Sequence, residues 1–134
     1  KKNKKVIGIL MIDMDGLKPI NDRYGHRAGD AALKEIGQRI ASHTRNDDLV
    51  ARLGGDEFAV ILTNIADLDL ATKAMNRIAE TCGLPFAFEN VSLKIGASIG
   101  LAVFPEDAQS IDQLMETADL KMYHNKRQRK MADV

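Results

Sequence analysis

The chain has 134 residues, the size of one ordinary domain with a single hydrophobic core. Apolar residues make up 45% and charged residues 28% of it, a balance that excludes disordered and fibrous proteins. The longest apolar run, residues 6–12, is far shorter than the ~20 residues that cross a bilayer. We therefore expect one folded domain over residues 1–134, with no membrane contact from this segment.

Charge is distributed unevenly, although 19 basic and 19 acidic residues cancel overall. Basic blocks stand at both ends, and across residues 6–125 acidic residues outnumber basic ones by 18 to 11. An acidic body repels polyanions, so a nucleic-acid-binding protein is not expected, and a bound nucleotide needs a cation beside it. The single cysteine, Cys82, cannot form an internal disulfide, which predicts a cytoplasmic domain; a membrane tether elsewhere in a longer protein stays compatible with this.

The first part of the chain shows one strand pattern and one helix pattern. The β-branched run over residues 6–12 predicts a strand buried on both faces, ending at a carboxylate. Apolar residues at helical spacing predict a helix over residues 30–45. The link before it, residues 18–24, has room for another helical turn.

The middle of the chain predicts a hairpin and a second helix. Residues 49–53 and 58–62 are apolar stretches that flank Gly54-Gly55-Asp56-Glu57, the composition of a tight β-hairpin. A helix follows and ends before Gly83 and Pro85. One face of this helix is predicted to consist of Ala71, Ala74, Met75, Ile78, Ala79 and Cys82.

The last third predicts two further strands within residues 86–104 and then a final helix. Ser110 and Gln113 match a capping box at the start of this helix. Its predicted buried stripe comprises Ile111, Leu114, Met115, Ala118 and Met122. The order of elements favours an α+β fold of the ferredoxin-like or palm-like type, a central antiparallel sheet with helices packed on one face.

Two carboxylates follow the first strand. Asp13 and Asp15 are two residues apart, so both point to one side if the strand continues through them. A divalent cation would relieve their repulsion, and oxygen ligands of this kind suit Mg²⁺ or Mn²⁺. The alternative is a pair of solvated turn residues.

The hairpin tip supplies a second acidic pair, Asp56 and Glu57. The glycines before it, Gly54 and Gly55, allow positive φ and a close approach to the backbone. A solvent-facing hairpin without function is the alternative. Because the hairpin and the first strand are neighbours in this topology, Asp13 and Asp56 could converge on one metal.

A polar stretch between these motifs contains Lys18, Asn21, His26 and Asp30. An amide and a carboxylate suit the edge of guanine, which offers two N–H donors and one acceptor. Asp30 could instead be a helix N-cap, and His26 a surface loop residue.

These motifs together resemble one family. Residues 13–30 read Asp13-Met-Asp-Gly-Leu-Lys-Pro-Ile-Asn-Asp-Arg-Tyr-Gly-His-Arg-Ala-Gly-Asp30, and residues 52–58 read Arg52-Leu-Gly-Gly-Asp-Glu-Phe58. Both segments closely resemble the GGDEF domain of diguanylate cyclases, with the signature pentapeptide intact. The resemblance extends over residues 6–126.

The resemblance implies an enzyme that condenses two GTP into cyclic di-GMP with loss of two pyrophosphates. A homodimer is implied, in which each subunit holds one GTP, with Mg²⁺ or Mn²⁺ as cofactor. The implied metal ligands are Asp13, the Met14 carbonyl, Asp56 and Glu57. The implied catalytic residues are Asp56, which accepts the 3′-hydroxyl proton, Glu57 and Lys18, which steadies phosphate charge. The implied substrate-binding residues are Asn21, His26, Asp30, Gly54, Gly55 and Lys126.

A product-inhibition site is also implied. The family carries an Arg-x-x-Asp motif shortly before the pentapeptide, and Arg45-Asn-Asp-Asp48 stands there. Cyclic di-GMP has two phosphates and two guanines, so we expect Arg77 or a second subunit to complete the site. The alternative is an exposed arginine at a helix end beside acidic neighbours.

The chain departs from the family pattern at both ends. The helical segment that usually precedes the first strand is missing, so we expect the domain to be truncated at its N-terminus, with the regulatory region upstream. The usual Lys-x-x-Gly-Arg pattern reads Lys126-Arg127-Gln128-Arg129-Lys130, so the glycine is lost and Lys126, with Arg129 or Lys130, is left for phosphate.

Alternatives of other classes are a non-catalytic GTP- or cyclic di-GMP-binding module and, third, a class III-type nucleotide cyclase. A binding-only relative is expected to lose one of Asp13, Asp56 or Glu57. All three are present, which favours the enzyme.

Overall fold

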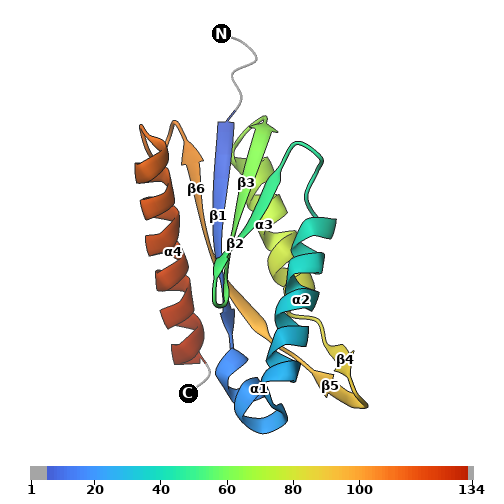
Figure 1. The fold of residues 1–134 in the computed structure, drawn as a ribbon. Helices are drawn as coiled ribbons and strands as arrows, with labels where there is room; N and C mark the ends of the chain where they lie inside the picture. The colour runs from blue at the N-terminus through green and yellow to red at the C-terminus, as the bar shows by residue number, and fades with distance from the viewer. Residues whose placement is uncertain (1–5, 133–134) are drawn as a thin grey trace.

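A four-stranded antiparallel sheet forms the centre of the molecule (Figure 1). The computed structural model describes residues 6–132; residues 1–5, with the first basic block, lie outside the described residues, as does the side chain of Lys130. The strands stand in the order β2-β3-β1-β6, and β1 is a central strand. Their bounds are β1 (Val6–Asp15), β2 (Leu49–Gly54), β3 (Glu57–Ile65) and β6 (Gly96–Phe104). The predicted α+β class is confirmed.

Helices cover both faces of this sheet, whereas the sequence pattern favoured one face. In Figure 1, α4 lies on one side of the strands, and α2 and α3 lie on the other. The buried residues form two separate hydrophobic clusters, one on each face of the sheet. The described residues form four helices, α1 (Leu17–Tyr24), α2 (His26–Ser42), α3 (Leu68–Cys82) and α4 (Ile111–Ala132).

Strand β1 shows why both faces need cover. Leu10 and Ile12 belong to the cluster on the α2 and α3 side, and Ile9 and Met11 to the cluster on the α4 side. Successive strand residues point to opposite faces, so an unbroken apolar run requires packing on both. The prediction of a strand buried on both faces is confirmed.

The predicted start of the second helix, near Asp30, is wrong. Helix α2 begins at His26, and Gly25, with φ of 93°, separates it from α1. Asp30 therefore lies within the helix and is not its N-cap. Ala28 and Gly29 are buried, so tertiary packing supports a first turn that lacks a side-chain cap. The additional helical turn predicted before it is confirmed as α1.

The segment predicted to hold two strands holds three. Strands β4 (Phe86–Phe88) and β5 (Val91–Leu93) form a small separate hairpin before β6. Glu89 and Asn90 have φ of 42° and 70°, which reverse the chain. The hairpin over β2 and β3 and the apolar face of α3 are confirmed.

Helix α4 begins after the predicted N-cap, with the Gln113 main-chain N–H donating to Ser110 Oγ at 3.2 Å. The predicted capping box is only half formed, because Gln113 Oε1 accepts from the Gln109 N–H at 3.0 Å and not from Ser110. Its stripe is narrower than predicted. Leu114, Ala118 and Met122 are buried, but Ile111 and Met115 are exposed because they flank the line of contact with the sheet. No helix in the described range is long and apolar enough to span a membrane.

Candidate active site

Strand β1 ends at one edge of the sheet with two carboxylates on the same face. Asp13 lies opposite Glu57 of β3 and Ser98 of β6, and Asp15 lies opposite Gly96. The alternation of β1 places both carboxylates on the α4 side, which continues the face of Ile9 and Met11. The strand does continue through Asp15, as the paired spacing requires.

The turn between β2 and β3 is attached to this end of β1. Gly54 and Gly55 have φ of 133° and 53°, a conformation that favours glycine. The Met14 N–H donates to the Asp56 carbonyl at 3.0 Å, and the Arg52 guanidinium donates to the Gly55 carbonyl at 2.8 Å and 3.1 Å. These bonds hold Asp56 beside the end of β1.

Asp13 lies beside a second carboxylate, Asp56, and the Lys126 ammonium. Burial raises its pKa, the neighbouring Asp56 carboxylate raises it further, and the Lys126 ammonium only partly offsets them. Its Oδ1 atom is buried and accepts no hydrogen bond, while its Oδ2 atom lies 3.1 Å from Lys126 Nζ. A buried acceptor of this kind is available to a cation.

Lys126 provides the positive charge at this edge. Its Nζ lies 2.9 Å from Asp15 Oδ1 and 3.3 Å from the Met14 carbonyl oxygen, besides the contact with Asp13. Burial lowers the pKa of this amine, but hydrogen bonds to Asp15 and Asp13 outweigh burial and raise the pKa above its ordinary value. The ammonium thus stays charged among three oxygens.

The oxygen atoms around Lys126 Nζ are also the groups that could bind a divalent cation at this site. In the described part of the chain, no three His, Cys, Asp or Glu side chains converge on one point. Asp13, Asp56 and the Met14 carbonyl still offer hard oxygen ligands, and Oδ1 of Asp13 has no other partner. Mg²⁺ commonly takes few protein ligands and completes its shell with water and phosphate. The residues therefore fit a metal that binds together with a phosphate ligand.

A cavity of about 430 Å³ opens beside these groups. Lys18 stands at its rim, strongly exposed and paired with Asp22 at 3.0 Å. The lining residues come from β1, α1, the hairpin turn and α4, and they are Met14, Asp15, Gly16, Leu17, Lys18, Pro19, Asp56, Lys126 and Arg129. Segments far apart in sequence thus form one pocket with both carboxylates and amines.

The predicted guanine-reading residues lie on α1 and α2, away from the lining of that cavity. Asn21 Oδ1 is buried without a hydrogen-bond partner, and its side chain lies against Gly29, where a Cβ would overlap it. Asp30 is exposed and lines a separate groove with Arg52. His26 is exposed at the first turn of α2.

The sequence did not assign a definite role to two residues of this cavity, Asp15 and Arg129. The spacing of residues along α4 nevertheless indicates that two of its basic side chains face the sheet. The buried stripe of α4 advances in steps of four residues through Leu114, Ala118 and Met122, and the same spacing leads to Lys126. Arg129 Nε donates to Asp15 Oδ2 at 2.8 Å. If the apolar stripe of α4 is continued into the polar residues that follow it, it predicts that Lys126 and Arg129 face β1.

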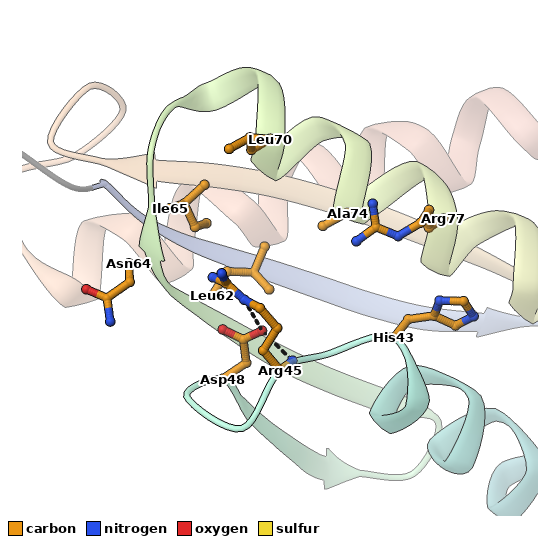
Figure 2. A pocket seen from close by; sticks show the side chains of 9 residues that line it. All are labelled: His43, Arg45, Asp48, Leu62, Asn64, Ile65, Leu70, Ala74 and Arg77. Atoms are coloured by element: carbon orange, nitrogen blue, oxygen red, sulfur yellow. Dashed lines mark hydrogen bonds and ion pairs between the residues drawn. The ribbon is translucent and has the colours of Figure 1, made fainter.

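The predicted inhibitory residues line a second, smaller cavity of about 170 Å³ (Figure 2). Arg45 and Asp48 lie in the link between α2 and β2, and Arg77 faces them from α3. Both Asp48 carboxylate oxygens accept main-chain N–H groups, from Arg45 at 2.9 Å and from Thr63 at 3.1 Å. The two arginines therefore border one hollow, while the Asp48 carboxylate is engaged within its own chain.

The family model described as "Diguanylate cyclase, GGDEF domain" matches residues 1–132. The chain belongs to the GGDEF family. It is 39% identical over 127 residues to the bifunctional diguanylate cyclase/cyclic di-GMP phosphodiesterase MucR of Pseudomonas aeruginosa, covering 95% of this chain and 18% of MucR. It is 41% identical to the diguanylate cyclase TpbB of the same species, covering 95% of this chain and 29% of TpbB.

Solved GGDEF domains share the fold. A structure of TpbB comprising only the GGDEF domain superimposes with a TM-score of 0.91 at 40% identity, covering 95% of this GGDEF chain and 74% of the other. The GGDEF domain of DgcB from Caulobacter crescentus, in complex with c-di-GMP, gives a TM-score of 0.81 at 27% identity, covering 92% and 73%. The chain spans less than a third of either curated relative.

Proposed function

We propose that this GGDEF domain is a diguanylate cyclase, which condenses two GTP molecules into cyclic di-GMP and releases two pyrophosphates. The observation that carries the proposal is that Asp13 lies beside two residues that line one cavity, the Asp56 carboxylate and the Lys126 ammonium. Carboxylates and amines at one pocket suit a triphosphate and its metal. The names of MucR and TpbB support the same activity.

The metal would be Mg²⁺ or Mn²⁺, held by Asp13, the Met14 carbonyl, Asp56 and Glu57. When bound, it neutralises phosphate charge and polarises the reacting oxygen. Lys126 now contacts two of these ligand groups, so we propose that its ammonium moves from Asp13 to the phosphates when the nucleotide and metal bind. Lys18, which lines the same cavity, is proposed to bind phosphate oxygens as well.

Asp56 is proposed as the base. It accepts the proton of the 3′-hydroxyl as that oxygen bonds to the α-phosphorus of the second GTP, and the bond to the β-phosphate breaks to release pyrophosphate. Gly54 and Gly55 let the main chain approach the nucleotide closely. The step occurs twice, so two domains must face each other, and we propose a homodimer.

Guanine would bind against α1 and α2. Asn21 Oδ1, buried without a partner, is proposed to accept an N–H of the base, because an unsatisfied buried acceptor gains most from such a donor. Asp30 would accept the other N–H, and exposed His26 would border the pocket.

The cytoplasmic location of the domain stays a prediction, made from its single cysteine, Cys82.

The cavity between Arg45 and Arg77 is proposed as a cyclic di-GMP site that limits activity. Two guanidinium groups at one hollow suit a phosphodiester, and the DgcB domain is named as a complex with c-di-GMP. A second subunit would cover the rest of the ligand. The same cavity supports the alternative function, a cyclic di-GMP-binding module without turnover.

Product analysis separates these two functions. The protein is incubated with GTP and Mg²⁺ and the nucleotides are separated by chromatography, with Asp56→Asn as the matched control. We expect cyclic di-GMP from the parent only, and similar melting temperatures because Asp56 lies in a turn that contributes little to the core. Unchanged GTP with retained cyclic di-GMP binding would establish the alternative.

A further inference from the structure

The contact between α4 and the sheet changes from apolar to ionic along its length. On the sheet, the face that carries Ile9 and Met11 continues into Asp13 and Asp15. On α4, the buried apolar stripe continues into Lys126 and then Arg129, which contact these carboxylates. Lys126 and Arg129 are therefore part of the packed interface between α4 and the sheet.

Asp15 is the centre of the ionic part. Its Oδ1 accepts from Lys126 Nζ at 2.9 Å, and its Oδ2 accepts from Arg129 Nε at 2.8 Å. Ser98, a fully buried residue on β6, donates its hydroxyl to the same carboxylate at 2.8–3.0 Å. Asp15 is thus oriented from β6 and in turn orients two cations at the cavity.

Gly96 provides the space that Arg129 occupies. It lies opposite Asp15 in the β1–β6 register, and a Cβ there would overlap Nη2 of Arg129 and lie 3.7 Å from Asp15 Oδ2. Its φ lies outside the left-handed region, so the backbone accepts other residues. A side chain at this position would displace the guanidinium, which lies directly on the main chain.

We propose that Asp15 and Gly96 are positioning residues that hold Arg129 so that its guanidinium binds the triphosphate of the substrate. The inference rests on the proposed function and deepens it. Arg129 uses one N–H for Asp15, its side chain is 46% exposed, and it lines the same cavity as Lys18 and Lys126. The remaining N–H groups of a planar guanidinium suit phosphate oxygens.

The position of Arg129 in the sequence explains why a special arrangement is needed. It stands where the family pattern has glycine, so its side chain has to be accommodated against the sheet. The absence of a Cβ at Gly96 accommodates it, and the Asp15 carboxylate orients it.

Competition binding tests the proposal. The fluorescent probe is 2′-deoxy-3′-mant-GTP, bound in the presence of Mg²⁺. It is displaced by 3′-deoxy-GTP or by 3′-deoxy-GMP. These three nucleotides lack a free 3′-hydroxyl, so they cannot condense. In Gly96→Ala and in Arg129→Ala we expect the affinity for the triphosphate to fall about tenfold and that for the monophosphate to stay unchanged, as loss of a charge-assisted hydrogen bond predicts. In the double variant we expect no further loss, because Gly96 acts only through Arg129.

Several outcomes would overturn the inference. A parental protein that prefers triphosphate, together with an Arg129→Ala variant that keeps this preference, excludes a phosphate-binding role. Equal losses for both ligands indicate a merely structural effect. If Gly96→Ala does not fold, Arg129→Ala decides alone, because its side chain is half exposed. Failure of the proposed function is distinct: the parent then makes no cyclic di-GMP from GTP.

Discussion

Arg45 and Asp48 belong to one motif but have different environments. The Asp48 side chain is 2% exposed and accepts the main-chain N–H groups of Arg45 and Thr63. The Arg45 side chain is 64% exposed and donates to the Thr63 carbonyl at 2.8 Å. Asp48 therefore holds the link before β2 in place, and Arg45 is the residue available to a ligand.

This difference predicts that substitutions of the two residues lower the stability of the domain by different amounts. Asp48→Ala is expected to lower the free energy of unfolding by about 1–3 kcal/mol, because two main-chain donors lose their acceptor. Arg45→Ala, the matched control, is expected to cost less than about 1 kcal/mol, since its contacts are exposed. Urea denaturation measures both.

Ligand binding completes the comparison. Titration calorimetry of Arg45→Ala should show weakened cyclic di-GMP binding and unchanged GTP binding. Loss of both affinities together would show that the two cavities are not independent, and equal stability of the two variants would contradict the structural role of Asp48.

At the scale of elements, one arginine joins α2 to the end of α3. Arg39 is 13% exposed and pairs with Glu35 at 2.9 Å. Its Nη1 also donates to the main-chain carbonyls of Thr81 and Leu84 at 2.8 Å and 2.6 Å. The carbonyls at a helix C-terminus lack intrahelical partners, so this guanidinium caps α3 from a neighbouring helix.

Arg39→Ala is therefore expected to lower the free energy of unfolding by about 2–4 kcal/mol, because the Glu35 carboxylate and the main-chain carbonyls of Thr81 and Leu84 lose one donor together. Arg27→Ala is the control, since Arg27 forms a 2.7 Å ion pair with Glu89 while 82% exposed, and should cost under about 1 kcal/mol. Guanidinium chloride denaturation, which screens ion pairs, and urea denaturation should both show the difference. Equal losses would indicate that the cap is not a stabilising contact.

A second element-scale prediction concerns the close approach of α4 to β6. A Cβ at Gly100 would overlap the main chain of α4 at Ala118 and Met122. Gly100→Ala should displace the helix and lower the free energy of unfolding by about 1–3 kcal/mol. Gly83→Ala is the control, since its Cβ would have only ordinary contacts at 3.7 Å and φ is −82°.

Thermal unfolding monitored by circular dichroism measures this pair. A lower melting temperature is expected for Gly100→Ala alone. Similar melting temperatures for both variants would mean that α4 tolerates a larger distance from the sheet.

At the scale of the whole molecule, the acidic body restricts nucleotide binding. Because acidic residues outnumber basic ones by 18 to 11 across residues 6–125, a triphosphate needs a counter-ion. We predict that GTP affinity, measured by calorimetry, falls at least about tenfold when Mg²⁺ is replaced by EDTA, a loss of about 1.4 kcal/mol or more. Equal affinity in EDTA would show that Lys18, Lys126 and Arg129 neutralise the phosphates without metal.

Local patterns were sufficient to predict the types of the main elements. The run before Asp13, the turn at Gly54 and Gly55 and the cap at Ser110 act within a few residues, so sequence alone identifies them. The same locality explains the error at Asp30: a helix start that depends on burial of Ala28 and Gly29 leaves no capping signal. The acidic motifs and the resemblance to the GGDEF family were likewise identified from the sequence alone.

Only the tertiary structure decided which face α4 covers and what its basic end contacts. Lys126 Nζ meets the Met14 carbonyl across 112 positions of sequence, and Arg129 meets Asp15 across 114. Such contacts depend on how the helix lies on the sheet, which is set by packing of side chains from both partners and by the absence of a Cβ at Gly96 and Gly100. The periodicity of apolar residues along one helix does not determine how that helix lies on the sheet, so these contacts could not be predicted from the sequence.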